Sequence, residues 1–247
     1  MRIKGLIILL LAGLMLKSCF EEDQPVPPYQ PPGDVVPVSI PLSLYTHQTY
    51  FDLAGAQITG ENENSAWDLA FECGENGYHV RINNADLLGI ARTGVTKIDS
   101  AFADFKGLTW NTDRSDGNPD STAIGEWLSI TGEDTLYSHE VMLIGQFDGI
   151  GYIPFKKLQF IHVDRGMYRF VFADPGSLRC DTVAIEKNPL YRSIQYSLRS
   201  GKKLQLEPLS EEWDLLFGQY HTILYTDDSI RAPYYVRGVL IQAESVE

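Results

Sequence analysis

The sequence predicts an all-β protein whose antiparallel sheets form one sandwich-like domain with few short helices. Short alternating or aromatic-rich runs lie between turns rich in Gly, Asn and Asp. Long helical periodicity is absent, and strands do not alternate with helices as they do in parallel α/β proteins. The 247 residues include 13 Tyr, 11 Phe and 4 Trp, which are large side chains that favour strands and fill cores.

Residues 1–18 predict a signal peptide. Arg2 and Lys4 precede the apolar run Gly5–Leu16, which is shorter than the roughly 20 residues that span a bilayer and suits the hydrophobic region of a signal peptide. The run leads into Leu-Lys-Ser-Cys, which resembles a bacterial lipobox and implies that Cys19 becomes a lipidated first residue. The alternative is an ordinary secretory signal with an incidental cysteine.

Residues 19–40 predict a tether. The acidic cluster Phe20–Asp23 resembles the surface-export signal of Bacteroidota lipoproteins, and Gln24–Gly33 contains five prolines. Proline favours extended polyproline II, which spans about 3 Å per residue. The sequence therefore predicts an outer-membrane lipid-anchored protein, exposed at the cell surface, whose folded domain occupies residues 41–247.

The composition excludes some classes of protein. The net charge is −13, and it becomes −16 when cleavage of the signal removes Arg2, Lys4 and Lys17. An acidic chain lacks the basic surface that a nucleic-acid partner requires. Three cysteines are too few for a disulfide scaffold. Cys73 and Cys180 could form one disulfide in an oxidising compartment or remain two buried thiols.

The domain contains several recognisable elements. Asp164–Gly166 predicts a tight hairpin turn with Gly166 in a left-handed conformation. Weak helical patterns cover Thr96–Phe105 and Leu209–Glu212. Asn111–Thr122 carries several acids but does not match the calcium-loop pattern, so a solvated loop of turn residues is a sufficient interpretation. The predicted strands are Tyr78–Ile82, Leu158–Val163, Met167–Phe172, Tyr191–Leu198 and Tyr234–Gln242.

An internal repeat links the two halves of the domain. Trp-Asp-Leu-Ala-Phe at 67–71 recurs as Trp-Asp-Leu-Leu-Phe at 213–217, and a glycine precedes each tryptophan by 12 positions. The partial repeat covers 50–85 and 196–240. In a strand, Trp and Phe four residues apart share a face, which should be buried, while Asp points away or bonds a backbone amide. We therefore expect structural roles for Trp67, Asp68, Phe71, Trp213, Asp214 and Phe217.

These features together resemble the HmuY-like family of Bacteroidota surface lipoproteins. The resemblance rests on the lipobox with its acidic leader, the Trp-Asp-Leu-Ala-Phe motif followed by the strand at 78–83, and the hairpin at 157–172. It covers most of the chain after Leu44. It implies a hand-like all-β fold and, as in the best-known members, haem held between strand-borne loops and passed to an outer-membrane receptor.

The resemblance also implies that two His or Met side chains from the middle of the domain grip the haem iron. The candidates begin with His139 and Met142 and continue with His162 and Met167. His162 alternates with Leu158 and Phe160, so its side chain is expected to face the core.

The sequence offers no motif for catalysis. It contains no nucleophile elbow, no zinc-protease helix motif and no recognisable Cys–His pair. We therefore expect a binding protein and not an enzyme. The alternative to haem capture is a non-catalytic binding or assembly lipoprotein that recognises a protein or a glycan.

Overall fold

The computed structural model describes residues 46–100, 102, 105–132, 134–225 and 231–242, together with 28, 33 and 37–40. The chain divides into two units, Met1–Pro37 and Val38–Glu247, and all strands listed below belong to the second. The predicted signal peptide, Cys19 and most of the predicted stalk lie outside the described residues. Within those residues, no helix is long and apolar enough to cross a membrane.

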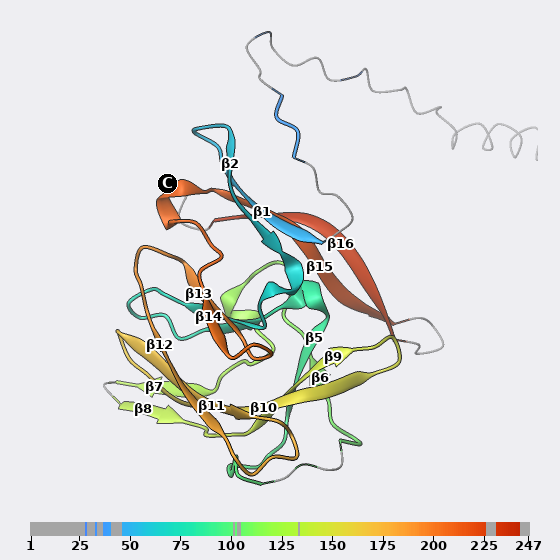
Figure 1. Ribbon diagram of the computed structural model, residues 1–247, viewed down its shortest axis with the longest axis vertical. Helices are drawn as coiled ribbons and strands as arrows, with labels where there is room; N and C mark the ends of the chain where they lie inside the picture. The colour runs from blue at the N-terminus through green and yellow to red at the C-terminus, as the bar shows by residue number, and fades with distance from the viewer. Residues whose placement is uncertain are drawn as a thin grey trace, which may run out of the picture. The chain divides into compact units, whose positions relative to one another are not determined.

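The strands form antiparallel sheets, as predicted (Figure 1). The end sheet has the order β16-β15-β1-β2, with β1 His47–Asp52, β2 Gln57–Glu63, β15 Leu215–Tyr225 and β16 Arg231–Ile241. The middle sheet has the order β14-β13-β3-β4, with β3 Leu69–Glu72, β4 Val80–Ile82, β13 Ser193–Ser197 and β14 Lys202–Leu204.

A larger sheet and a separate hairpin complete the domain. The six-stranded sheet has the order β12-β11-β10-β9-β5-β6, with β5 Leu88–Arg92, β6 Trp110–Asn111, β9 Met142–Phe147, β10 Tyr152–Val163, β11 Met167–Ala173 and β12 Asp181–Glu186. The hairpin pairs β7 Leu128–Thr131 with β8 Asp134–Tyr137. Short 3-10 helices are η2 Asn64–Ala66, η3 Asn84–Asp86, η4 Pro119–Ser121 and η5 Ser210–Glu212.

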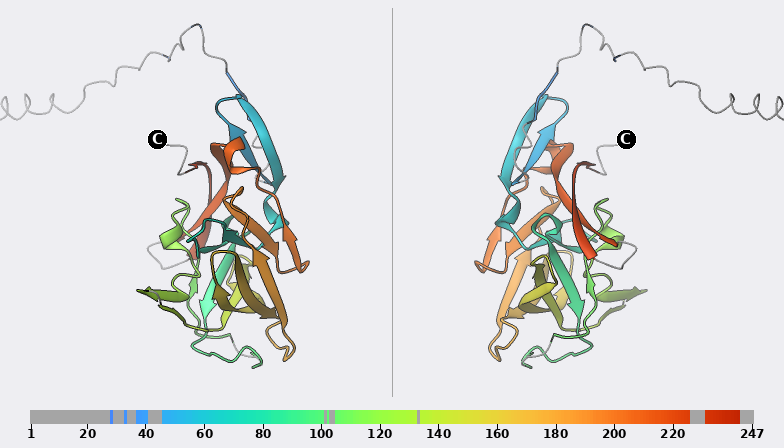
Figure 2. Two further views of the ribbon diagram at one scale, coloured as in Figure 1. Left: turned by 90° about the vertical axis from the view of Figure 1, so that its left-hand side faces the viewer. Right: turned by 90° about the vertical axis from the view of Figure 1, so that its right-hand side faces the viewer.

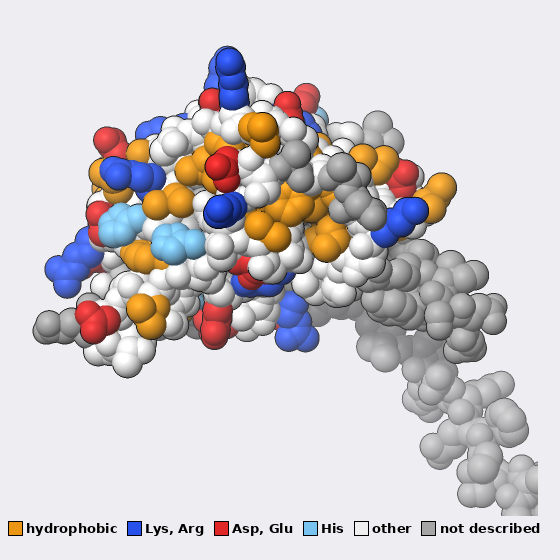
Figure 3. All heavy atoms as spheres, turned by 90° about the horizontal axis from the view of Figure 1, so that it is seen from below, with side chains coloured by type: hydrophobic (Ala, Val, Ile, Leu, Met, Phe, Trp, Pro, Cys, Tyr) orange, Lys and Arg blue, Asp and Glu red, His pale blue; other side chains and the backbone are white. Residues whose placement is uncertain are grey.

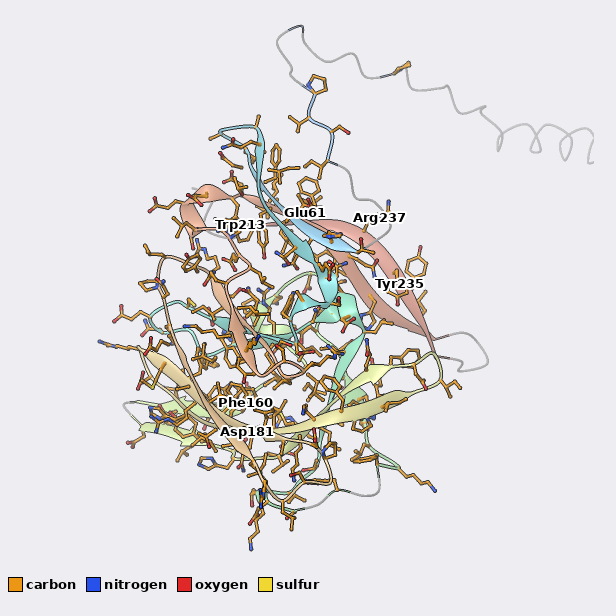
Figure 4. All side chains as sticks on the ribbon, viewed as in Figure 1. Glu61, Phe160, Asp181, Trp213, Tyr235 and Arg237 are labelled. Carbon is orange, nitrogen blue, oxygen red and sulfur yellow. The ribbon has the colours of Figure 1, made fainter. Side chains whose placement is uncertain are left out.

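The main core lies where side chains of the middle sheet meet those of the six-stranded sheet. Phe71 on β3 is fully buried, and its ring centroid lies 6.4 Å from Phe160, 5.1 Å from Tyr168 and 5.3 Å from Phe170. Such aromatic pairs add to the stabilisation that comes from burying their area. This core lies toward β10 and β11, where Figure 4 labels Phe160, whereas the end sheet occupies the opposite end of the domain (Figure 2).

The internal repeat is visible as an exchange of strands. β1 and β13 are equivalent in the repeat, as are η2 and η5, which lie 146 positions apart. β3 of the first unit pairs with β13 of the second, while β15 of the second pairs with β1 of the first. Each Trp-Asp strand therefore pairs with the first strand of the other unit, and the two units build one domain.

The two repeated aspartates each accept a hydrogen bond from a backbone amide of the other repeat unit. Asp68 Oδ2 accepts a hydrogen bond of 3.3 Å from the Arg199 amide, and Asp214 Oδ2 accepts one of 2.8 Å from the Leu53 amide. Leu53 and Arg199 are themselves 146 positions apart. Of the two possibilities for these aspartates, the bond to a backbone amide is therefore the one present in both units.

The expected common buried face is only partly correct. Phe71 is buried, and Trp213 is buried against Tyr50, with ring centroids 5.0 Å apart. Trp67 and Phe217 are half-buried. Both tryptophans precede their strands, since β3 begins at Leu69 and β15 at Leu215, so neither follows the alternation of its strand.

Two local predictions are wrong. Residues 96–100 are not helical, because side chains of the sheet bind the carbonyls of this segment. Gln159 Nε2 donates to Thr96 O at 2.8 Å, and Lys157 Nζ donates to Ser100 O at 2.6 Å.

Gly166 does not adopt a positive φ, because the Asp164 carboxylate closes the turn by accepting hydrogen bonds from the amides that follow it.

Two other predictions have clear outcomes. The short helix expected at Leu209–Glu212 is present as η5. Cys73 and Cys180 are free thiols, so the disulfide is absent. Cys73 Sγ lies 3.7 Å from Phe71 O in the middle sheet, whereas Cys180 Sγ lies 3.8 Å from Ile98 O beside the six-stranded sheet.

Candidate functional site

Two of the predicted iron ligands meet at one tyrosine. His139 follows β8, and His162 lies on β10; their ring centroids lie 5.8 Å and 5.6 Å from the ring centroid of Tyr137. The ring of Tyr137 also packs against the buried Trp127, with ring centroids 5.9 Å apart. We call Tyr137, His139 and His162 the histidine site. It is therefore an exposed imidazole pair backed by the core.

His162 faces outward, contrary to the prediction. The pairing of β10 with β11 shifts between Phe160 and His162, so that Ile161 is an extra residue on β10. Such a β-bulge re-aims the side chains that follow it. The His162 side chain is 44% exposed, which makes it available to a ligand.

Both ring nitrogens of His162 have a hydrogen-bond partner. Its Nδ1 lies 3.0 Å from Tyr137 Oη, which donates its own proton to Val163 O at 3.0 Å. Nε2 lies beside the Asp164 carboxylate, which can only accept a hydrogen bond, so Nε2–H donates to Asp164. Ligation of a metal by Nε2 would require loss of this proton, with Tyr137 holding Nδ1. A partner that fixes the second ring nitrogen in this way is typical of metal-binding histidines.

Nε2 of His162 lies 3.2 Å from Asp164 Oδ2. Hydrogen bonds from the amides of Gly166 and Met167 lower the pKa of Asp164, so this carboxylate is ionised at neutral pH. A metal would take the place of this contact.

His139 is held in an unusual backbone conformation. Its φ is +50°, in the left-handed region that non-glycine residues rarely adopt. Gln159 on β10 donates a hydrogen bond to the His139 carbonyl. Strain of this kind persists where the surrounding structure enforces it, and it is concentrated at functional sites.

The two methionine candidates have different surroundings. Met142 is fully buried in the core, so the structure does not bring it to the histidine site. Met167 is half-buried, and its Sδ lies 3.9 Å from Arg169 Nη2. Because Arg169 pairs directly with His162, Met167 and Arg169 lie beside His162 on the same face.

The surroundings of the histidine site combine apolar and charged groups. Ile130 on β7 shares the face of the hairpin that carries Tyr137 and is 59% exposed. Arg169 is exposed on β11. Figure 3 shows histidine side chains close together on one face, with hydrophobic and charged side chains around them. Among the described residues, no three His, Cys, Asp or Glu side chains gather to hold a metal ion, whereas haem brings its own ring of nitrogens and needs only axial ligands.

A second feature, which the sequence did not reveal, is a cavity of about 540 Å³. It is lined by residues of the end sheet, the middle sheet and the loop around 113–119, and we call it the tryptophan cavity because Trp67 and Trp213 both line it. Figure 4 labels Trp213 near the end sheet. The only sequence signal for it was the repeated Trp-Asp motif.

Asp113 shows that the 111–122 loop is not simply a solvated loop. Its side chain is buried and accepts hydrogen bonds from Ile82 N at 2.9 Å and Ala123 N at 2.6 Å. Burial raises the pKa of Asp113 to about 6. The loop is therefore fixed to β4 by a carboxyl group that titrates in a mildly acidic range.

This pKa predicts a change of stability with pH. Because folded Asp113 binds its proton more tightly than the unfolded chain does, its contribution to the free energy of unfolding falls as pH rises from about 4 to about 6, by on the order of 3 kcal/mol. Urea unfolding across this range should show a smaller fall for Asp113→Asn than for the wild type. Asp116→Asn, at a 55% exposed carboxyl group of the same loop, is the control. Parallel curves for wild type and Asp113→Asn would contradict the assignment.

The fold and the histidine site define an all-β domain that carries an exposed pair of imidazoles. A family model described as HmuY protein matches residues 44–173, just over half of the chain. The chain therefore belongs to the HmuY family. Neither the comparison with curated proteins nor that with solved structures found a significant match.

Proposed function

We propose that this domain captures haem at the histidine site, with His139 and His162 as the axial ligands of the iron. The observation that carries the proposal is that both imidazoles, from a loop and from a bulged strand, pack against Tyr137 on the exposed side of the core. Imidazole is a common axial ligand of haem iron. The HmuY match, which includes both histidines, supports the same ligand class.

The neighbouring residues suit the rest of the haem molecule. Exposed Ile130, on the face of the hairpin that carries Tyr137, offers apolar contact to the porphyrin ring. Arg169, opposite His162 in the β10–β11 pairing, offers a guanidinium group to a propionate, an interaction that arginine makes with two parallel hydrogen bonds. Met167 is the alternative sulfur ligand beside His162.

We further propose that the domain works outside the cell. The signal sequence, Cys19 and the Pro-rich segment support a lipid-anchored protein in the outer membrane, exposed at the cell surface. Such a tether would place the histidine site within reach of free haem and of an outer-membrane receptor that takes it up. The role is binding and transfer, without catalysis.

A haemin titration of the mature protein tests the proposal. We expect a saturable shift of the Soret band with a stoichiometry of one haem per chain, in the ferric state and after reduction, because imidazole ligates both states of the iron. Bovine ribonuclease, which has no haem site, serves as the blank protein in the titration. Absence of a saturable shift in both states would overturn the proposal.

A further inference from the structure

We infer that the tryptophan cavity is a second ligand site, and that it takes a saccharide. This site is distinct from the histidine site, since Figure 1 places the end sheet and β8 at opposite ends of the domain. Part of its wall, including Trp213 and Tyr220, lies beyond the residues that match the HmuY model. The cavity volume of about 540 Å³ falls within the range of about 300–1,000 Å³ that is usual for small-molecule sites.

The strand exchange brings the two repeated tryptophans to this one cavity. Trp213 is 8% exposed, and Trp67 is half-buried. The indole Nε1–H groups of both are buried and have no acceptor among the described residues. Tyr220 Oη and Ser210 Oγ, also in the cavity wall, are likewise buried without a described partner. The wall thus holds several hydrogen-bond donors that a bound ligand could satisfy, and leaving such buried groups unpaired is costly.

The acidic groups of the wall are already occupied. Glu207 accepts hydrogen bonds from Arg192 N at 2.8 Å and from Ser193 Oγ at 2.7 Å, and Asp113 is bonded to two amides as described above. Arg81 differs, because its side chain makes no hydrogen bond or ion pair with the described residues although it lines the cavity. It opposes the rise in pKa that burial causes in Asp113 and Glu207. The groups left for a ligand are therefore a guanidinium, indoles and hydroxyls.

This set of groups matches the chemistry of a sugar. A pyranose presents many oxygen acceptors around its edge and C–H groups on its faces. The wall offers donors for the oxygens, and the rings of Tyr50, Trp67, Trp213 and Tyr220 for the faces. Haem fits this cavity poorly, because the histidine in its lining, His79, already lies 2.7 Å from Glu72.

The test uses the four tryptophan indole signals in a ¹H–¹⁵N NMR spectrum of the mature protein. The probes are glucose, galactose, N-acetylglucosamine, maltose and lactose, with glucuronate as the acidic form of the same ring. We expect at least one sugar to shift the Trp67 and Trp213 signals in a saturable way. The signal of Trp127, whose indole donates to Tyr78 O at 3.1 Å, should not move. Stronger binding of glucuronate than of glucose would show that Arg81 reads the carboxylate.

Three variants make the test specific. Trp213→Phe and Arg81→Gln should each weaken the sugar affinity about tenfold, as expected for loss of one buried hydrogen bond. Trp110→Phe is the matched control, because Trp110 stacks on Tyr152 at 4.9 Å and does not line the cavity. Thermal unfolding checks that each variant folds. No saturable shift with any probe, a shift confined to Trp110 or Trp127, or unchanged affinity in both cavity variants would overturn the inference. Haemin binding tests the histidine site independently.

Discussion

The double variant His139→Ala/His162→Ala is expected to lose the saturable Soret shift in a haemin titration. Both imidazoles pack against Tyr137, so removing them deprives the iron of both proposed axial ligands. Since loss of a partner that merely orients a ligand already costs about 10–100-fold in metal affinity, loss of both ligands should weaken haem binding by at least about 100-fold. Each single variant should keep a weaker and spectrally altered band.

Two further variants separate ligation from other effects. Tyr137→Phe keeps the ring but removes the hydroxyl that bonds His162 Nδ1 at 3.0 Å, so it should weaken binding about tenfold without abolishing the band. His79→Ala changes a histidine that contacts Glu72 and Asp120 and should leave the titration unchanged. A normal Soret band in the double variant would exclude His139 and His162 as ligands.

The sequence predicted the fold class well, because alternation and turn residues are local signals. It also predicted the repeat, and a bond to a backbone amide was one of the two possibilities that it left for Asp68 and Asp214. It did not predict that β3 pairs with β13 and β15 with β1. Which strands pair depends on contacts between residues far apart in the chain, and no local pattern specifies them.

The candidate site was harder to predict than the fold. Simple alternation placed His162 in the core, but one extra residue, Ile161, turned it outward. The same alternation gave no warning that Met142 would be fully buried. The tryptophan cavity escaped prediction because it arises only when the end sheet, the middle sheet and the 113–119 loop come together. Residues such as Arg81 and Asp113 carry no signal of their own in the sequence.

The two sites lie on different parts of the exchanged architecture. The histidine site belongs to β8, β10 and the loop after β8, all within the segment that matches the HmuY model. The tryptophan cavity draws its two tryptophans from both units of the repeat. Damage to the strand exchange should therefore disturb the cavity more than the histidine site, and the contact between Asp68 and Arg199 is where such damage can be tested.

Replacing Arg199 with leucine is expected to cost about 3 kcal/mol of unfolding free energy at neutral pH. Asp68 is fully buried, and the Arg199 guanidinium bonds its carboxylate and lies 3.1 Å from Asp86 Oδ2. Removing one partner of a buried ion pair leaves an uncompensated charge, which is strongly destabilising. This expected loss of unfolding free energy lies at the lower end of the range for removing one partner of a buried ion pair, because the Arg199 side chain is 36% exposed.

The pH dependence of this variant provides a second test. Burial raises the pKa of Asp68 even though Arg199 opposes the rise, so loss of Arg199 should raise it further. A carboxyl group whose pKa is raised on folding stabilises the protein when protonated and loses that contribution as pH rises through the folded pKa. Urea unfolding should therefore show a large difference between wild type and Arg199→Leu at about pH 7.5 and a smaller one at about pH 4.

The matched control is Arg165→Leu. Arg165 lies 3.3 Å from Glu75, with side chains 80% and 67% exposed, and exposed pairs contribute at most about 1 kcal/mol. A second comparison is Asp68→Asn/Arg199→Leu, which removes the buried negative charge together with its partner and should be more stable at neutral pH than Arg199→Leu alone. If Arg199→Leu and Arg165→Leu lost equal stability, or if the added Asp68→Asn change gave no recovery, the buried pair would not be what holds the exchanged strands together.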